Sequence, residues 1–354
     1  MYNNKMARRR SFIERTNKKK RIRSRSRIRS RNRNRTKNRT KRINQKGGVK
    51  ILATLAGHSS SVHSVAFHPR LPILATGSLD RTVKLWRLSL VYSSATNIAT
   101  LAGHSDGVLS VAFHPTAPLL ATGSLDRTVK LWSFSDDCLF PPEIQVSKKH
   151  PPALVATLEG HDSHVTSVAF HPTAPLLATG SNDNTVRLWL LSCDYSSATN
   201  VVNLAGHSRW VNTVAFHPTA PLLASGSSDN TVILWRLSSD YLSATLLATL
   251  AGHSNLVLSV AFHPTAPILA TGSYDNTAKL WLLSPDYSSA SVIETIVGHG
   301  RAVESVAFHP TAPLLATGSD DMTVILWNYD EPSPAPEPTP SCPLNASGRS
   351  VPSY

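Results

Sequence analysis

One unit of sequence recurs six times in this chain of 354 residues. A Gly-His pair opens each unit, a tryptophan closes it 28 residues after the histidine, and a stretch close to SVAFHPTAPLLATGS lies between them. The Gly-His pairs begin at Gly57, Gly103, Gly160, Gly206, Gly252 and Gly298, so the step is 46 residues except for one of 57. A period of this length indicates an array of supersecondary units, each packed against its neighbours.

Each repeat contains four short apolar segments, which in the first repeat read ILATLA, HSVAF, ILATGS and TVKLW. They are rich in Val, Leu and Thr, and Gly, Pro, Asp and Ser separate them, as is typical of strands and turns. Because the segments are apolar on both sides, each small sheet must be covered on both faces by its neighbours. Four-stranded sheets stacked radially around an axis meet this requirement, so we predict an all-β fold.

These features together resemble the WD-repeat family of β-propellers, whose period is 40–45 residues. The resemblance covers all six repeats and implies a six-bladed propeller over residues 49–329. One departure is systematic, because the residue after each closing tryptophan is never the aspartate of the family's name. It is Arg87, Ser133, Leu190, Arg236, Leu282 or Asn328, which removes one turn contact familiar from the family.

The sixth repeat lacks its fourth segment. A proline-rich tail over residues 330–354 follows it, which cannot supply a strand and which we expect to be disordered. The segment at 49–55 precedes the first Gly-His pair and matches the missing one. As in other members of the family, we expect it to pair with the sixth blade and close the ring. Deleting residues 49–56 should then expose a strand edge and favour aggregation.

Every repeat also holds a histidine, a hydroxyl and an aspartate, the residue types of a nucleophilic triad. The histidine and aspartate are always 22 residues apart, and a set that occurs six times is a structural device, so we predict no enzyme. The resemblance implies a hydrogen-bond network within each blade, with the tryptophan packed between blades. Its members are His58, Thr76, Asp80 and Trp86, and in the later repeats His104, Asp126, Trp132, His161, Asp183, Trp189, His207, Asp229, Trp235, His253, Asp275, Trp281, His299, Asp321 and Trp327.

Six further histidines precede prolines, at His68, His114, His171, His217, His263 and His309. A ring of imidazoles suggests a metal, but no second histidine or carboxylate accompanies them at ligand spacing. We therefore predict a role in the turns, no metal and no cofactor. The chain also lacks a Gly-rich phosphate loop, an HExxH motif and paired CxxC motifs.

Other classes are excluded by composition. The three cysteines lie far apart, which argues against a disulfide scaffold or a zinc site. No apolar run reaches the roughly 18–20 residues of a membrane helix, and the start of the chain has no apolar signal-peptide core. We therefore expect no membrane association and a nuclear or cytoplasmic location.

The copies differ mainly in two windows at one end of the propeller, which the family calls the top face. These are the residues after each Gly-His pair and the residue before each repeat aspartate. The fourth and fifth repeats place Arg209, Trp210, Leu256, Leu258 and Tyr274 there, and the third adds His164. Because Trp, Tyr and Arg are enriched at binding hot spots, we expect a protein or peptide to bind here. The alternative is that Trp210 folds over its own blade and seals the edge.

The longer step between the second and third repeats comes from 11 extra residues within 136–152, at the opposite end from the top face. This insertion is either a docking loop for a second partner or a linker that has drifted in sequence.

Residues 1–48 form a basic arm. Residues 1–50 carry 22 of the 36 Lys and Arg and one acid, a net charge of +21, while the remainder carries −7. Every second residue is arginine at Arg21, Arg23, Arg25, Arg27, Arg29, Arg31, Arg33 and Arg35. Such an arm is expected to be disordered and to bind RNA or DNA phosphates without sequence specificity, or to serve nuclear import. An amphipathic organelle-targeting peptide is a third alternative, but the isoleucines of the arm form no apolar face.

The sequence thus favours a non-catalytic scaffold that binds a protein through the top face, with a basic arm for nuclear import, nucleic-acid tethering, or both. In the alternative, the arm is the main nucleic-acid-binding element and the propeller is a passive body. Copies this similar are also compatible with a recently expanded array that has little selected function.

Overall fold

The computed structural model describes residues 53–89, 93–134 and 152–329. The chain divides into two units, residues 1–54 and 55–354, and all six sheets belong to the second. The arm, nearly all of the 136–152 insertion and the proline-rich tail lie outside the described residues. The segment at 49–55 lies mostly outside them, and its last three residues are in no strand, so the ring-closing strand stays a prediction.

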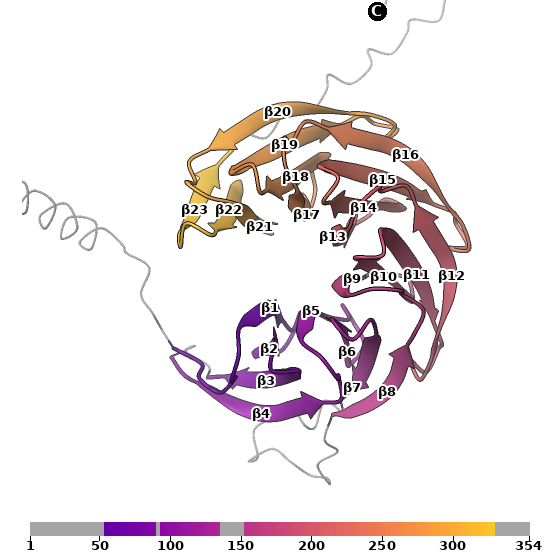
Figure 1. Cartoon of the computed structure of the whole chain (residues 1–354), viewed down its shortest axis with the longest axis vertical. Coiled ribbons are helices and arrows are strands. Elements are labelled where there is room, and N and C mark those ends of the chain that lie inside the picture. The colour runs from indigo at the N-terminus through magenta and orange to yellow at the C-terminus, as the bar shows by residue number, and fades with distance from the viewer. Residues whose placement is uncertain (1–52, 90–92, 135–151, 330–354) are drawn as a thin grey trace, which may run out of the picture. The chain divides into compact units, whose positions relative to one another are not determined.

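The described residues form six antiparallel sheets, one per repeat (Figure 1). The first consists of β1 (Val62–Phe67), β2 (Ile73–Ser78), β3 (Thr82–Leu88) and β4 (Ala95–Ala102), and the second of β5 (Val108–Phe113), β6 (Leu119–Ser124), β7 (Val129–Ser133) and β8 (Ala153–Leu158). The third has β9 (Val165–Phe170), β10 (Leu176–Ser181), β11 (Thr185–Leu191) and β12 (Ala198–Ala205), and the fourth β13 (Val211–Phe216), β14 (Leu222–Ser227), β15 (Thr231–Leu237) and β16 (Ala244–Ala251). The fifth has β17 (Val257–Phe262), β18 (Ile268–Ser273), β19 (Thr277–Leu283) and β20 (Ala290–Val297), and the sixth β21 (Val303–Phe308), β22 (Leu314–Ser319) and β23 (Val324–Asn328).

The sheets follow one another around an arc, with the first strand of each repeat innermost and the fourth on the outside (Figure 1). Within each sheet, the strands lie side by side in the order in which they occur along the chain. The described residues contain no helix. The all-β, six-bladed propeller arrangement that the sequence predicts is confirmed.

The second strand of each repeat lies at the heart of its sheet. In the first five sheets all six of its residues are buried, for example Ile73–Ser78 in β2. A strand with no exposed face requires cover on both sides, which the neighbouring sheets supply. This explains why ILATGS-type segments are apolar and small throughout instead of alternating.

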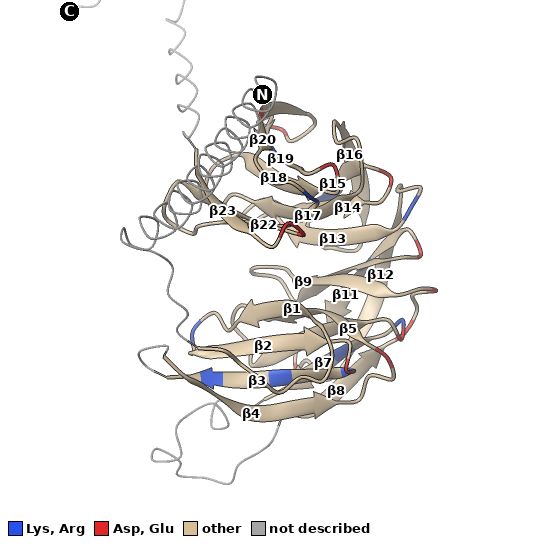
Figure 2. Ribbon diagram, turned by 60° about the vertical axis from the view of Figure 1, so that its left-hand side comes forward, with Lys and Arg blue, Asp and Glu red and all other residues tan. Residues whose placement is uncertain are grey.

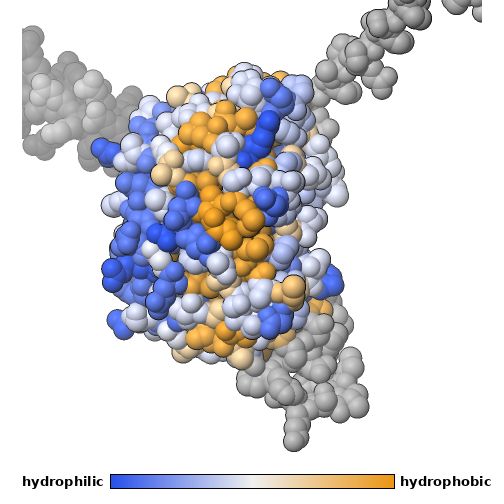
Figure 3. All heavy atoms as spheres, turned by 90° about the vertical axis from the view of Figure 1, so that its right-hand side faces the viewer, coloured by the Kyte–Doolittle hydropathy of each residue, from blue (hydrophilic) through white to orange (hydrophobic). Residues whose placement is uncertain are grey.

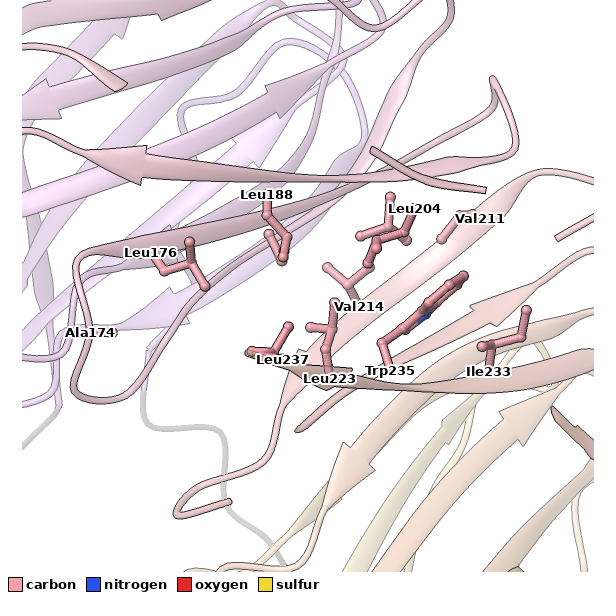
Figure 4. Packing of buried hydrophobic residues seen from close by; sticks show 12 residues of the cluster. Ala174, Leu176, Leu188, Leu204, Val211, Val214, Leu223, Ile233, Trp235 and Leu237 are labelled. Carbon is pink, nitrogen blue, oxygen red and sulfur yellow. The ribbon is translucent and has the colours of Figure 1, made fainter. Parts of the chain in front are cut away.

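Close approach of neighbouring sheets needs a glycine. Between the third and fourth sheets, Leu188 and Leu204 face Val211 and Trp235 across a packed core (Figure 4). A methyl group added to Gly180 would lie only 2.8 Å from a methyl carbon of Val211. Glycine in the TGS segment therefore allows the first strand of the next sheet to approach.

The turn after each repeat aspartate contains a residue in the left-handed region. It is Arg81, Arg127, Asn184, Asn230, Asn276 or Met322, with φ between 68° and 72°. Asparagine adopts this conformation at a lower energetic cost than most residues, including arginine and methionine.

Acidic side chains and exposed apolar side chains occupy different parts of the surface. Acidic residues lie mainly in the turns between strands (Figure 2). The side of the molecule that carries β12 and β16 has an apolar area flanked by hydrophilic side chains (Figure 3). Leu242, just before β16, and Leu246, within β16, are large exposed apolar residues.

Candidate functional site

The predicted network residues are hydrogen-bonded in all six sheets. In each, histidine Nδ1 lies 2.6–2.9 Å from an aspartate Oδ2 and Nε2 lies 2.7–2.8 Å from the hydroxyl oxygen on the second strand. The tryptophan Nε1–H donates to the same hydroxyl at 2.8–3.0 Å. The hydroxyl belongs to Thr76, Thr122, Thr179, Ser225, Thr271 or Thr317.

The direction of these bonds follows from what each group can do. An ionised carboxylate only accepts, so the Nδ1–H of His104 donates to Asp126. Nε2 of His104 is hydrogen-bonded to the Thr122 hydroxyl, whose oxygen accepts from the Nε1–H of Trp132. The Thr122 hydroxyl is fully buried and bonded to both His104 and Trp132, so it links the loop before the first strand to the third strand of its sheet from the inside.

The aspartates also hold the turn that follows them. Asp183 accepts hydrogen bonds from the backbone N–H and the hydroxyl of Thr185 and from the backbone N–H of Asp162. Burial alone raises the pKa of the Asp183 carboxyl, but hydrogen bonds from His161 and Thr185 outweigh this effect and hold that pKa well below its usual range. The same balance holds for Asp126 with His104 and Thr128.

The histidines before proline act in the turns. Nδ1 of His171 accepts the backbone N–H groups of Thr173 at 3.2 Å and Ala174 at 2.9 Å. The other five accept backbone N–H groups two and three residues on in the same way. A protonated Nδ1 has no lone pair for these bonds, so the turn requires a neutral imidazole.

Five of these histidines also pack across the junction to the next sheet, a role that the sequence alone did not reveal. The ring of His171 stands edge-on to Phe216 and Tyr241 of the fourth sheet, with centroids 5.0 and 5.2 Å apart. The equivalent rings at the other junctions are Phe113 and Phe134, Phe170 and Tyr195, Phe262 and Tyr287, and Phe308 and Tyr329. The recurrence of tyrosine six residues after Trp189, Trp235 and Trp281 was the available signal.

The two variable windows of each repeat adjoin. The backbone N–H of Ser228 donates to the carbonyl of Trp210 at 2.8 Å, and that of Tyr274 donates to Leu256 at 2.9 Å. The same bond links the two windows in the other described repeats, for example from Asn182 to His164. Side chains that differ between copies are therefore gathered at one end of each sheet.

A surface pocket of about 430 Å³ opens at this end, between the fourth sheet and its neighbours. Arg209, Trp210 and Leu256 line it, together with Asn184, Ser208 and Ser228. Trp210 is 56% exposed. We call this group of six residues the Trp210 pocket.

The remaining predicted binding residues lie outside the pocket lining. Tyr274 is 50% exposed, and its backbone N–H donates to the carbonyl of Leu256, as described above. Leu258 is half-buried within β17. His164 is exposed, and its Nδ1 lies 3.4 Å from the Asn182 side-chain amide. Asn184, Ser208 and Ser228 are pocket residues that the sequence did not single out.

Within residues 53–89, 93–134 and 152–329, no three His, Cys, Asp or Glu side chains are grouped as a metal site would require. In the same ranges no helix has the length and hydropathy to cross a membrane.

Known proteins share the repeat. The family described as "WD domain, G-beta repeat" matches residues 49–87, 95–133, 152–189, 198–236, 244–281 and 290–328. Human pre-mRNA-processing factor 19 is 38% identical over 158 residues, which cover 45% of this chain and 27% of that protein. Human striatin-4 is 28% identical over 142 residues, covering 38% and 18% of the two chains.

A probable cytosolic iron-sulfur protein assembly protein 1 from Scheffersomyces stipitis is 29% identical over 149 residues, 40% of this chain and 41% of that one. The chain spans only about a quarter of the length of the factor 19 relatives it matches. Propellers of this kind generally serve as non-catalytic scaffolds that bind protein partners. With all six repeats matched, and with the six sheets built as described, the chain belongs to the WD-domain, G-beta repeat family.

Proposed function

We propose that this protein is a non-catalytic scaffold that binds a protein or peptide at the Trp210 pocket, at the end of the propeller where the repeats differ. The observation that carries the proposal is an exposed tryptophan, the one tryptophan outside the repeated framework, beside Arg209 and a half-buried Leu256. Loops on a rigid scaffold are the usual place for binding residues.

The chemistry of the pocket indicates its partner. The Trp210 indole and Leu256 offer apolar area, the Arg209 guanidinium offers a cation, and the hydroxyls of Ser208 and Ser228 offer hydrogen bonds. A peptide segment with an apolar side chain next to a carboxylate fits this set, because arginine pairs with carboxylates through two parallel hydrogen bonds. The backbone of Tyr274 is hydrogen-bonded to that of Leu256, so the exposed ring of Tyr274 extends the contact surface on the fifth sheet.

The test is capture of proteins from a nuclease-treated lysate by the full chain and by its Trp210→Ala, Tyr274→Ala double variant. Proteins retained by the first and lost by the second support the proposal, provided both chains melt at the same temperature. The matched control is Leu242→Ala, another exposed apolar residue, which does not line the pocket. Equal capture by all three chains contradicts a binding site at the Trp210 pocket.

A second candidate function rests on the segregation of charge. The +21 of residues 1–50 opposes the −7 of the remainder, so the arm is suited to RNA or DNA phosphates, to nuclear import, or to both. In this alternative the propeller is a passive body. A nuclear or cytoplasmic location accords with either candidate.

The two candidates separate on deletion of residues 1–48. If the scaffold candidate holds, the shortened chain still captures its protein partners. If the arm is the main binding element, the shortened chain captures none and the full chain binds nucleic acid with a steep salt dependence. For 6–10 phosphate contacts, affinity falls by roughly 10³–10⁵ between 50 and 200 mM salt.

A further inference from the structure

Two polar side chains join the sheets that form the Trp210 pocket. Thr166 on β9 of the third sheet and Asn212 on β13 of the fourth hold the same place, the second residue of the innermost strand. The Thr166 hydroxyl donates to the carbonyl of Val211, and the Asn212 side-chain amide donates to the carbonyl of Val257 at 2.9 Å. Each bond therefore runs from one sheet to the first residue of the innermost strand of the next sheet.

Both bonds end beside an apolar residue of the pocket. Val211 directly follows Trp210, and Val257 directly follows Leu256. Both valines are fully buried, and Val211 belongs to the core between the third and fourth sheets (Figure 4). Each bond thus restrains the backbone that carries one of the two apolar pocket residues.

Asn212 is also bonded to the lining of the pocket itself. Its Nδ2 donates to Ser228 Oγ at 3.1 Å, and Ser228 Oγ donates to Asn212 Oδ1 at 3.2 Å. Ser228 is buried, and its backbone N–H donates to the Trp210 carbonyl. One side-chain amide therefore connects the loop that carries Trp210, through Ser228, with the strand that follows Leu256.

At the other three junctions between described sheets this bond is absent. The corresponding residues are His63 in the first sheet, Leu109 in the second and Leu258 in the fifth. Leucine has no donor, and among the described residues His63 forms no hydrogen bond to the Val108 carbonyl of the next sheet. In the described part of the chain, the bond is thus confined to the two junctions that bring together the three sheets of the Trp210 pocket.

Close packing of two sheets does not require the bond. Val165 and Val303, which correspond to Val211 at the junctions with a leucine, are also fully buried. We propose that Thr166 and Asn212 are positioning residues of the Trp210 pocket, which hold its parts in the binding arrangement before a partner arrives. This inference rests on the proposed function, because it assigns the two residues a role in that site. A site that is arranged in advance binds more tightly, since less conformational freedom is lost on binding.

The first test needs no ligand and uses hydrogen exchange of the full chain, followed by mass spectrometry. Asn212→Leu removes the bond and should fold, since leucine holds this position in the second and fifth sheets. Exchange in segments 206–216 and 252–262 should become roughly tenfold faster, while segment 104–114 of the second sheet stays unchanged. Asn212→Thr keeps a donor at this position, as Thr166 does, and should stay within about threefold of the unaltered chain. Unchanged exchange in both pocket segments of Asn212→Leu overturns the proposal, as does an equal acceleration in segment 104–114.

The second test measures binding. Peptides are selected on the full chain from a phage-displayed library of random peptides, and one whose binding is lost in Trp210→Ala serves as the probe. Its Kd should rise roughly tenfold in Asn212→Leu and in Thr166→Leu, although neither residue lines the pocket, and Asn212→Thr should restore it to within about threefold. His63→Leu, which removes a polar side chain at the same position of the first sheet, is the matched control and should bind like the unaltered chain.

The outcomes separate this inference from the proposed function. A Trp210-dependent peptide that binds Asn212→Leu and Thr166→Leu as tightly as the unaltered chain overturns the positioning role and leaves the proposed function standing. An equal loss of affinity in His63→Leu also overturns it. If no selected peptide depends on Trp210 for binding, the proposed function itself fails, and the positioning role fails with it.

Discussion

The imidazole of His114 stands edge-on to the phenol ring of Tyr195, with centroids 5.2 Å apart, across the junction of the second and third sheets. Nδ1 of His114 is occupied by turn N–H groups, and its buried Nε2 has no hydrogen-bond partner among the described residues. A proton added to this ring would lose the turn acceptor and would place charge in an apolar junction. The junction therefore depends on a neutral histidine.

This dependence predicts that acid destabilises the protein before its carboxylates titrate. Burial lowers the pKa of His114, His171 and His217 below the ordinary 6.5. Below about pH 6.5 the unfolded chain binds protons that the folded chain does not, so stability is complete above this pH and falls as pH decreases. Urea unfolding between pH 8 and pH 5 should show this fall, and a flat profile contradicts it.

A pair of variants tests whether the buried imidazoles cause this loss of stability in acid. His171→Gln removes one buried imidazole and should reduce the slope of stability against pH. His309→Gln alters the equivalent turn of the sixth sheet, where no ring stacks on the imidazole among the described residues, and should lower the free energy of unfolding less than His171→Gln does.

The hydroxyl of Thr122 is expected to matter more than its methyl group. Thr122→Val leaves the buried partners His104 and Trp132 unpaired, and each stranded group costs about 1–3 kcal/mol. We expect the free energy of unfolding to fall by about 2–4 kcal/mol. Thr122→Ser is the matched control, since Ser225 occupies this position in the fourth sheet, and should cost about 1 kcal/mol or less. Equal losses for the two variants contradict the hydrogen-bond account.

The number of sheets could be predicted from the sequence, whereas part of the ring packing between sheets could not. The fixed spacing of Gly-His and Trp predicted the number and composition of the sheets, because each repeat builds one sheet from local contacts. The stacking of Tyr195 on His114 was not predicted, since the position is filled by Phe134 and Tyr329 from a different spacing in the second and sixth repeats.

The candidate site was predictable only in part. Trp210 stood out because no other repeat has an aromatic residue there. Asn184 was missed, and Leu258 and Tyr274 do not line the pocket, because the loops that converge depend on how successive sheets are rotated about the axis. Residue spacing within one repeat carries no information on that rotation.

Close packing at the junctions predicts an asymmetric response to a single methyl group. In Gly226→Ala the new methyl carbon would lie 2.7 Å from Val257 and 2.8 Å from Thr213, an overpacking that costs about 1–3 kcal/mol. Gly318→Ala meets only Ser305 at 3.9 Å and should change stability by no more than about 0.5 kcal/mol in dilute protein. Urea unfolding of the two variants measures the difference, and similar losses would mean that the glycine is not needed for close approach.

The left-handed turn residues offer a stabilising change. Met322 has a φ of 68° and is almost fully exposed, so no packing contact compensates for the energetic cost of its backbone conformation. Met322→Asn should raise the free energy of unfolding by about 0.5–1 kcal/mol, because asparagine adopts the left-handed region more readily. The reverse change, Asn230→Met, should lower the free energy of unfolding by a similar amount. A destabilised Met322→Asn variant or a stabilised Asn230→Met variant would contradict this explanation.

Two tryptophans, each replaced by alanine and compared in an unfolding and a capture assay, separate binding from folding. Trp235 is 2% exposed at a junction, whereas Trp210 is 56% exposed at the pocket. Trp235→Ala should lower the free energy of unfolding by about 3–5 kcal/mol. Trp210→Ala should leave that free energy within about 0.5 kcal/mol and abolish capture of the partner proteins. If Trp210→Ala unfolds the protein as severely as Trp235→Ala, or if it captures partners as well as the unaltered chain, the variable end of the propeller is not the binding site.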